Sequence, residues 1–157
     1  MKKNGTIIIY TDGACSGNQS SSNVGGWGAV FKYGKHKLEL CGGEKNTTNN
    51  RMEMTGVIKA LERLKRKDLP VRLHTDSAYV CNCLNQKWYQ GWRKNGWKNA
   101  RKQPVENKEL WIRLLELYES MEDIEIIKVK GHAGVPMNEK ADELANKGMD
   151  EIRCSDM

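Results

Sequence analysis

The stretch Thr6-Ile7-Ile8-Ile9-Tyr10-Thr11-Asp12 is a run of apolar and β-branched side chains that ends in an acid. Such a run predicts a strand over 6–11. A second run, Val71-Arg72-Leu73-His74-Thr75-Asp76, has the same arrangement and predicts a strand over 71–75. Open α/β sheets place their ligands beyond the carboxyl ends of their strands. If the two strands are neighbours, the carboxylates of Asp12 and Asp76 therefore lie side by side.

Between these two runs the pattern continues as strands and then changes to a helix. Residues 26–33 and 37–41 favour strands, and Gly34-Lys35 between them is a turn signal. Together with the first strand they predict an antiparallel meander. Apolar residues then recur at helical spacing, at Met54, Val57, Ile58, Leu61 and Leu64. This periodicity predicts a helix with Glu53 in its first turn.

The second half of the chain alternates between helices and strands. Its patterns predict helices over 77–85 and 88–95, a longer helix from near Pro104, a strand over 124–130, a loop over 131–136 and a final helix over 138–149. Strands in series followed by such alternation predict an α/β fold, in which helices pack on the faces of a mixed sheet.

Length and composition indicate one domain. The chain has 157 residues, enough to bury a core without disulfides or metals. We expect a single domain over 1–157, with its core at about 6–149 and a short tail at 150–157. No apolar signal region precedes the first strand, and no apolar run is long enough to span a bilayer. These features predict a soluble, monomeric, cytoplasmic protein without membrane contact.

The cysteines fit the same compartment. There are five of them, an odd number without the paired spacing of a zinc site: Cys15, Cys41, Cys81, Cys83 and Cys154. Disulfides are rare in the cytoplasm. The sequence therefore predicts free thiols.

The net charge of +6 is concentrated in one segment, residues 87–102, which we call the basic segment. It holds six of the 26 Lys and Arg residues and no acid, which leaves 20 basic against 20 acidic residues elsewhere. It also carries Trp88, Tyr89, Trp92 and Trp97. Basic residues interleaved with aromatic ones are typical of a surface that follows a phosphate backbone. The alternative is an amphipathic helix with tryptophans facing the core, and we expect both interpretations to hold in part.

Four acids are candidates for a metal site, namely Asp12, Glu53, Asp76 and, in the final helix, Asp142. Clustered carboxylates repel one another, and a hard divalent cation with an incoming phosphate relieves that repulsion. Each acid also has an ordinary interpretation: Asp76 can cap a helix, Glu53 can favour a helix dipole, and Asp142 can be a solvated surface acid. The coincidence of all of them with Asp12 favours the cluster.

Six short motifs follow one another along the chain. They are Thr11-Asp12-Gly13, Thr48-Asn49-Asn50-Arg51-Met52-Glu53, Thr75-Asp76-Ser77, Gly96-Trp97-Lys98, Val129-Lys130-Gly131-His132 and Asn138-Glu139-Lys140-Ala141-Asp142. In this order and spacing they resemble type 1 ribonuclease H, from about Thr6 to Met149. The resemblance implies a ribonuclease H-like α/β fold, a five-stranded mixed sheet with helices on both faces.

The resemblance also implies an activity. It is that of an endonuclease that cuts the RNA strand of an RNA/DNA hybrid with two Mg²⁺ ions, with Mn²⁺ as a substitute, and leaves 5′-phosphate and 3′-hydroxyl ends. Asp12, Glu53, Asp76 and Asp142 match the family's metal-binding carboxylates. Two cations about 3.5–4 Å apart would activate a water and stabilise the leaving oxygen. His132 matches a histidine that moves protons or assists product release.

Further matches concern the substrate. Side chains and backbone that reach RNA 2′-hydroxyls in the minor groove correspond to Cys15, Asn18, Asn49 and Asn50. The DNA strand would meet an aromatic channel at Tyr79 and Trp88 and a phosphate pocket that includes Thr48 and Asn107. From the basic segment we expect nucleic-acid contacts at Lys94, Trp97, Lys98, Arg101 and Lys102.

Three features depart from the family pattern. Asn46 stands where a basic residue often supports the phosphate pocket, although Lys45 is adjacent, and this predicts a weaker grip on the DNA strand. Ala78 stands where some members place a longer side chain against RNA, which predicts one contact fewer. The loop over 17–25 lacks the proline-rich form common in bacterial members.

Two other functions fit part of the sequence. Integrases and resolvases share such a fold, but they usually lack the tryptophan-rich basic segment and the Thr-Asn-Asn-Arg-Met-Glu stretch. A non-catalytic hybrid-binding module would keep the groove without the chemistry. The presence of all four carboxylates argues against the module.

Overall fold

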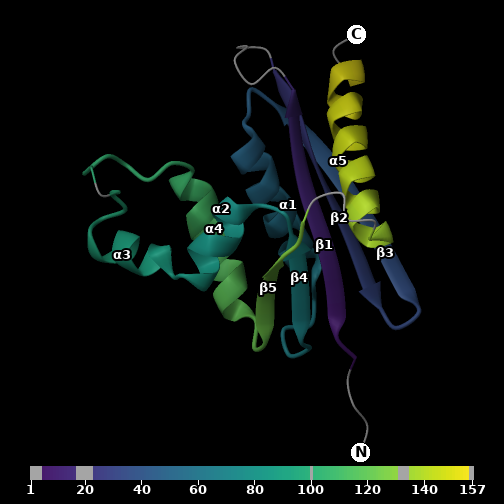
Figure 1. Ribbon diagram of the computed structural model, residues 1–157, viewed down its shortest axis with the longest axis horizontal. Helices are drawn as coiled ribbons and strands as arrows, with labels where there is room; N and C mark the ends of the chain where they lie inside the picture. The colour runs from purple at the N-terminus through teal and green to yellow at the C-terminus, as the bar shows by residue number, and fades with distance from the viewer. Residues whose placement is uncertain (1–4, 17–22, 100, 131–134, 156–157) are drawn as a thin grey trace, which may run out of the picture.

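The fold is built on one mixed sheet (Figure 1). The computed structural model describes residues 5–16, 23–99, 101–130 and 135–155. The strands lie in the order β3-β2-β1-β4-β5 and comprise β1 (Ile7–Ser16), β2 (Val24–Tyr33), β3 (His36–Lys45), β4 (Val71–Thr75) and β5 (Ile124–Lys128). The helices of the described part are α1 (Asn49–Arg63), α2 (Ala78–Asn85), α3 (Trp88–Lys94), α4 (Lys108–Ser120) and α5 (Pro136–Ser155). The predicted α/β class and five-stranded mixed sheet are confirmed.

Strand pairing places two acids side by side. β1, β2 and β3 form an antiparallel meander, whereas β1, β4 and β5 run parallel. Tyr10 of β1 lies beside His74 of β4, and their rings stack with centroids 4.2 Å apart. Asp12 lies two residues after Tyr10, and Asp76 lies two residues after His74. The predicted adjacency of these carboxylates therefore follows from the parallel register.

Side chains alternate between the two faces of the sheet, and helices cover both. On one face Ile9 and Leu73 are buried in the main core, against which α1 packs. On the other face Val30 packs with Ala141 and Leu144 of α5. Figure 1 shows α5 crossing one side of β1 and β2 while α1 lies on the other. Helices on both faces were predicted, and the structure confirms them.

Aromatic packing attaches α2, α3 and α4 to one another. Trp111 of α4 is fully buried, and its indole Nε1 donates to the Tyr79 hydroxyl at 2.9 Å. Trp92 of α3 packs against Trp111 with ring centroids 5.7 Å apart. Aromatic pairs of this kind bury large areas and prefer tilted geometries. The basic segment is therefore anchored to the main core through its own tryptophan.

Helix α5 lies very close to the sheet because glycines face it. A Cβ added to Gly28 would lie 2.5 Å from the carbonyl oxygen of Ala141. A Cβ on Gly26 would be still closer to the carbonyl oxygen of Ala145, and one on Gly148 would meet the backbone of β3 in the same way. Any side chain at these positions would push the helix outward. Only glycine at these positions allows α5 to pack this close to the sheet.

Two boundaries near the acids differ from the predictions. Asp12 lies within β1 rather than at its end, because β2 pairs with β1 along its length as far as Ser16. Helix α1 begins at Asn49, since the Thr48 side chain caps it by accepting a hydrogen bond from the Arg51 amide at 3.2 Å. Glu53 therefore lies in the second turn of α1, and its prediction in the first turn is wrong.

The later boundaries also move. Helix α4 begins at Lys108 rather than near Pro104, because Pro104 forms a β-bridge with Lys98 and Asn107 has a φ of 60°. Helix α5 extends to Ser155, so residues 150–155 continue a helix where a tail was predicted. Within the described residues no helix has both the length and the apolar character that crossing a bilayer requires.

Candidate active site

Three carboxylates from three elements meet at the centre of the sheet. Asp12 of β1, Glu53 of α1 and Asp76, directly after β4, each offer an oxygen, and these oxygens all lie within 4.8 Å of one another. Gly13 permits this approach, because a Cβ there would lie 2.5 Å from the backbone nitrogen of Glu53. Helix α1 can therefore bring its acid directly onto the strand.

The cluster is poorly solvated. Asp12 is 8% exposed and Glu53 is 5% exposed. Burial raises the pKa of Glu53 to about 10, and the charges of Asp12 and Asp76 contribute to the rise. Among the described residues, Glu53 Oε1 has no hydrogen-bond partner. A buried carboxylate oxygen without a partner is costly, and it suits a cation ligand.

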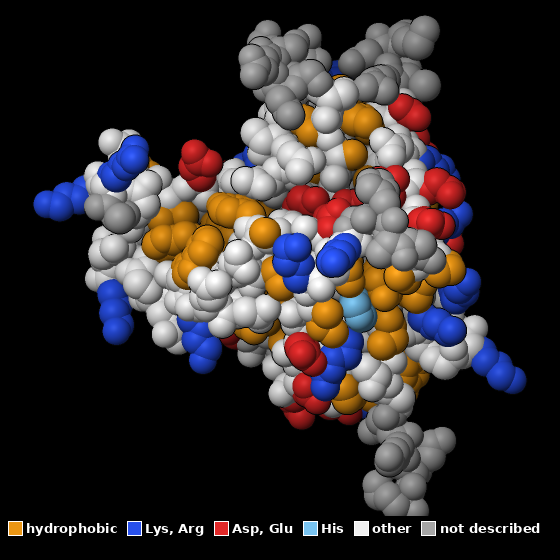
Figure 2. Space-filling view, in the orientation of Figure 1, with side chains coloured by type: hydrophobic (Ala, Val, Ile, Leu, Met, Phe, Trp, Pro, Cys, Tyr) orange, Lys and Arg blue, Asp and Glu red, His pale blue; other side chains and the backbone are white. Residues whose placement is uncertain are grey.

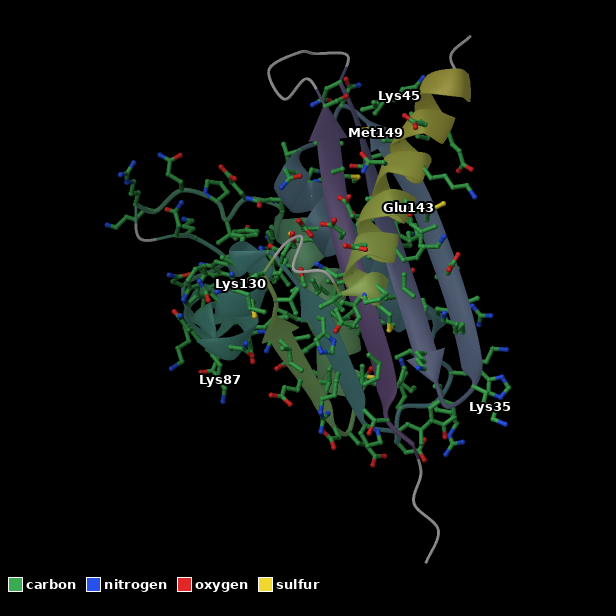
Figure 3. All side chains as sticks on the ribbon, turned by 45° about the vertical axis from the view of Figure 1, so that its right-hand side comes forward. Lys35, Lys45, Lys87, Lys130, Glu143 and Met149 are labelled. Carbon is green, nitrogen blue, oxygen red and sulfur yellow. The ribbon has the colours of Figure 1, made fainter. Side chains whose placement is uncertain are left out.

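Asp142 joins the cluster from the opposite face of the sheet. Burial, the charge of Asp76 and a hydrogen bond between the Asp12 and Asp142 carboxyls raise the pKa of Asp12 to about 8. In Figure 3, Glu143 marks the place of α5 beside β1, and Lys130 after β5 is drawn on the other side of the strand. Asp142 is thus next to Asp12, although its oxygens are not among those of the three acids that lie within 4.8 Å of one another. Hard oxygen ligands in this number suit Mg²⁺ or a similar divalent cation.

The residues predicted to contact RNA divide between two elements. Cys15 lies near the end of β1, and Asn49 and Asn50 are the first residues of α1. They approach each other through the segment before α1, because the Cys15 thiol lies 3.7 Å from the Thr47 carbonyl oxygen. Asn18 and His132 lie outside the described residues. Ala78, one of the departures from the family pattern, is exposed at the start of α2.

The structure gives a physical reason for Asn46. Its φ is 53°, in the left-handed region that asparagine tolerates better than most side chains. The residue turns the chain between β3 and α1. A basic side chain at this position would carry a larger backbone penalty, so the departure from the family pattern matches the local conformation.

Arg51 connects the two residues of the predicted phosphate pocket, a role that was not predicted from the sequence. Its amide donates to Thr48 Oγ1, and its guanidinium Nη1 donates to Asn107 Oδ1 at 3.4 Å. The same guanidinium lies 3.4 Å from Glu44 and 3.6 Å from Glu109. Thr48 and Asn107 are thus held near each other by one residue. Arg51 lies in the motif Thr48-Asn49-Asn50-Arg51-Met52-Glu53, but nothing local to that motif indicates its contact with Asn107, 56 residues further along the chain.

The core-packing interpretation of the basic segment is confirmed for two of its tryptophans. Trp92 and Trp97 are half-buried, pack against the main core and lie 6.0 Å apart between ring centroids. Trp88, in contrast, is 39% exposed. The same segment also carries four exposed cations, Lys94, Lys98, Arg101 and Lys102. Figure 2 shows Lys and Arg side chains projecting around a hydrophobic surface on the protruding part of the molecule.

One cation of this segment is already paired. Arg93 donates two hydrogen bonds to Glu119, at 2.9 and 2.8 Å, and its guanidinium lies over the Tyr89 ring. Arg93 is therefore less available to phosphate than its neighbours.

The basic segment also contains strained backbone, since Lys87, Trp97 and Lys102 have φ values of 60°, 63° and 63°. Such strain is often found where a site must hold one shape.

Comparison with known proteins agrees with this geometry. The family model for RNase H matches residues 4–150. The chain belongs to the RNase H family. A ribonuclease H of Dechloromonas aromatica is 50% identical over 148 residues, which cover 94% of this chain and 96% of that protein.

Two solved RNase H structures are similar to this family member. LC9-RNase H1, a type 1 RNase H with the type 2 active-site motif, has a TM-score of 0.82 and 28% identity, covering 96% of this chain and 75% of that one. LC11-RNase H1, solved in complex with RNA/DNA hybrid, has a TM-score of 0.68 and 27% identity, covering 93% and 98%. The type 1 resemblance is confirmed, and this RNase H is an enzyme rather than a non-catalytic module.

Proposed function

We propose that this RNase H cuts the RNA strand of RNA/DNA hybrids with two divalent cations, Mg²⁺ or in its place Mn²⁺, and leaves 5′-phosphate and 3′-hydroxyl ends. The observation that carries the proposal is the convergence of Asp12, Glu53 and Asp76 within 4.8 Å, with one buried oxygen of Glu53 left without a partner among the described residues. The ionised forms of such clustered carboxyls repel one another, and bound cations relieve that repulsion.

Each carboxylate has a definite task in this scheme. Asp12 of β1, Glu53 of α1 and Asp76 after β4 would hold the cations, with Asp142 of α5 as a fourth ligand. Bound there, the cations supply an activated water and stabilise the leaving 3′-oxygen. His132 would exchange protons with the water or the leaving group. The protein's own contribution is to keep four acids converging on the scissile phosphate.

The substrate would lie across the acids with its two strands on different elements. We place RNA over Cys15, Asn18, Asn49 and Asn50, whose short polar groups suit 2′-hydroxyls in a shallow minor groove. We place DNA along Thr48, Asn107, Tyr79, Trp88 and the exposed cations of the basic segment. The hybrid bound by the similar LC11-RNase H1 supports this assignment of substrate.

We also infer a monomer that acts in the cytoplasm. All four acids come from one chain, so the proposed site requires no second copy. Cys15, Cys41, Cys81 and Cys83 are free thiols, in keeping with a reducing compartment.

Cleavage assays with strand-labelled substrates test the proposal. We expect Mg²⁺-dependent cutting of the RNA strand of a hybrid, binding without cutting in Ca²⁺, and no cutting of duplex DNA. A run of ribonucleotides within a DNA strand should be cut well and a single ribonucleotide poorly, because several 2′-hydroxyls must be contacted together. Efficient incision at a single ribonucleotide, or equal cutting of duplex DNA, would contradict the proposal.

A further inference from the structure

Asn23, just before β2, joins three segments that are far apart in the sequence. Its side-chain Nδ2 donates to the Thr47 carbonyl oxygen at 2.8 Å, and its Oδ1 accepts from the Thr47 amide at 3.0 Å. Its backbone carbonyl accepts from the Asn46 amide at 2.9 Å. The Cys15 thiol of β1 lies 3.5 Å from the same Nδ2. One side chain thus ties the end of β1, the start of β2 and the connection into α1.

This junction is closed to solvent. Asn23 is 6% exposed and Thr47 is 4% exposed. A side-chain amide that satisfies both backbone groups of one residue leaves that residue a single geometry. Removing the amide would leave the buried Thr47 N–H without its partner and the Thr47 carbonyl oxygen with only the Cys15 thiol, 3.7 Å away. Losing a hydrogen bond in a buried place costs more than losing one at the surface. Asn23 therefore constrains the position of Thr47 more strongly than a surface contact could.

The constrained residue stands directly before the substrate side of the candidate site. Thr47 is followed by the α1 cap, Thr48, and then by Asn49 and Asn50. Across the junction lies Cys15. The two groups that would contact RNA therefore come from different elements, β1 and α1, and the Asn23 amide bonds to the link between them.

We propose that Asn23 is a positioning residue for RNA recognition. By holding Thr47 it sets the spacing between Cys15 on β1 and Asn49 and Asn50 on α1, and thereby the run of consecutive ribonucleotides that the groove requires. The inference rests on the proposed function and deepens it, because it assigns a determinant of substrate selection to a residue that touches neither the carboxylates nor, in this scheme, the RNA.

Two variants test the assignment. Asn23→Ala removes both side-chain hydrogen bonds, whereas Asn23→Asp keeps an acceptor for the Thr47 amide and sets a second oxygen against the Thr47 carbonyl. For Asn23→Ala we expect KM for hybrid to rise about tenfold, the equivalent of about 1.4 kcal/mol, with kcat unchanged because the four acids are untouched. Discrimination between a run of ribonucleotides and a single one should fall. Asn23→Asp should lie between parent and Asn23→Ala.

Asn85→Ala is the matched control. Asn85 also uses its side-chain Nδ2 to bond a backbone carbonyl, that of Ile126, at 3.1 Å, and it links α2 to β5 rather than β2 to α1. Its loss should lower the melting temperature without changing KM or the dependence on run length. Amide hydrogen exchange provides a readout that does not depend on activity, since the Thr47 amide should exchange faster in Asn23→Ala and not in Asn85→Ala.

The outcomes separate cleanly. If the Thr47 amide exchanges faster in Asn23→Ala while KM and the dependence on ribonucleotide run length stay at parental values, the positioning role is wrong. If Asn23→Ala and Asn23→Asp only lose stability, to the same degree as Asn85→Ala, the role of Asn23 is structural and the inference also fails. A parent enzyme that ignores ribonucleotide run length would instead overturn the proposed function itself.

Discussion

Asp12 and Gly28 face each other across β1 and β2, and the side of Gly28 that lacks a side chain is where α5 rests. The distance between sheet and helix at this point sets the distance between Asp12 and Asp142, because Ala141, the neighbour of Asp142, contacts Gly28. The fourth acid is thus placed by a glycine that carries no chemistry of its own.

Gly28→Ala should therefore damage the site without altering any acid. Its Cβ would lie 2.5 Å from the Ala141 carbonyl oxygen and 2.8 Å from the Ala145 nitrogen, so the helix must move outward. We expect a loss of about 1–3 kcal/mol in stability and a fall in kcat with hybrid affinity retained. The control is Gly56→Ala in α1, where the nearest atom would be 3.4 Å away and helix propensity improves. Equal behaviour of the two variants would contradict the account.

Asp12→Asn and Asp76→Asn should each abolish cleavage while the fold persists. Each change removes a proposed cation ligand and also removes one negative charge from a cluster that repels itself. Without divalent cations, both variants should be as stable as the parent or more stable, as measured by thermal unfolding in a chelator. Near-parental turnover of either variant in Mg²⁺ would show that the metal assignment is wrong.

Glu53 should make the metal-free enzyme less stable as pH rises. Its pKa is raised to about 10 from 4.5, and that of Asp12 to about 8 from 3.8. A raised carboxyl pKa means that the folded state holds a proton the unfolded state releases, so the contribution of these two groups to stability is greatest below about pH 4 and declines toward pH 8–10. Glu53→Gln should remove much of this decline and stabilise the metal-free protein by about 2–3 kcal/mol at pH 7.

Denaturant unfolding of parent and Glu53→Gln in a chelator, at about pH 5 and pH 8, measures the effect. The difference in unfolding free energy between the two proteins should grow with pH. A constant difference would mean that Glu53 has an ordinary pKa in the folded protein. Saturating Mg²⁺ should reverse the order, since it stabilises only the parent's intact ligand set.

Neutral replacements of Lys94, Lys98, Arg101 and Lys102 should raise KM and flatten its dependence on salt, because fewer counterions leave the hybrid on binding. Turnover at saturating substrate should change little. Arg93→Gln offers a control within the same segment, since Arg93 is already bound to Glu119. Arg93→Gln should change the salt dependence of KM less than the replacement of any one of the other four cations. An unchanged slope in the quadruple variant would remove this segment from the nucleic-acid surface.

His132→Ala should slow turnover by about ten- to a thousandfold and leave hybrid affinity nearly unchanged, since proton transfer by a placed side chain typically contributes a factor of about 10²–10⁴. Single-turnover rates and equilibrium binding in Ca²⁺ separate the two effects. A loss of binding as large as the loss of rate would place His132 among the substrate contacts instead.

The sequence predicted features that depend on local pattern and failed on those that depend on packing. Asp12 and Asp76 are neighbours because two parallel strands with the same apolar pattern each lead to an aspartate, and both strands were predicted. The second-turn position of Glu53 depends on where Thr48 caps α1, which periodicity cannot fix to a residue. The roles of Asn23 and Arg51 arise from hydrogen bonds across long separations along the chain. No local signal encodes such contacts.

The contact between α5 and the glycines of β2 also has a consequence for the order of events during synthesis. Asp12 lies in the first strand, whereas Asp142 belongs to the last helix, which packs on strands made much earlier. Contacts between such distant segments form late, because the intervening chain must be available first. A chain whose α5 has not yet been synthesised lacks its fourth carboxylate. The nuclease therefore gains its complete set of acids only when translation of the final helix is finished.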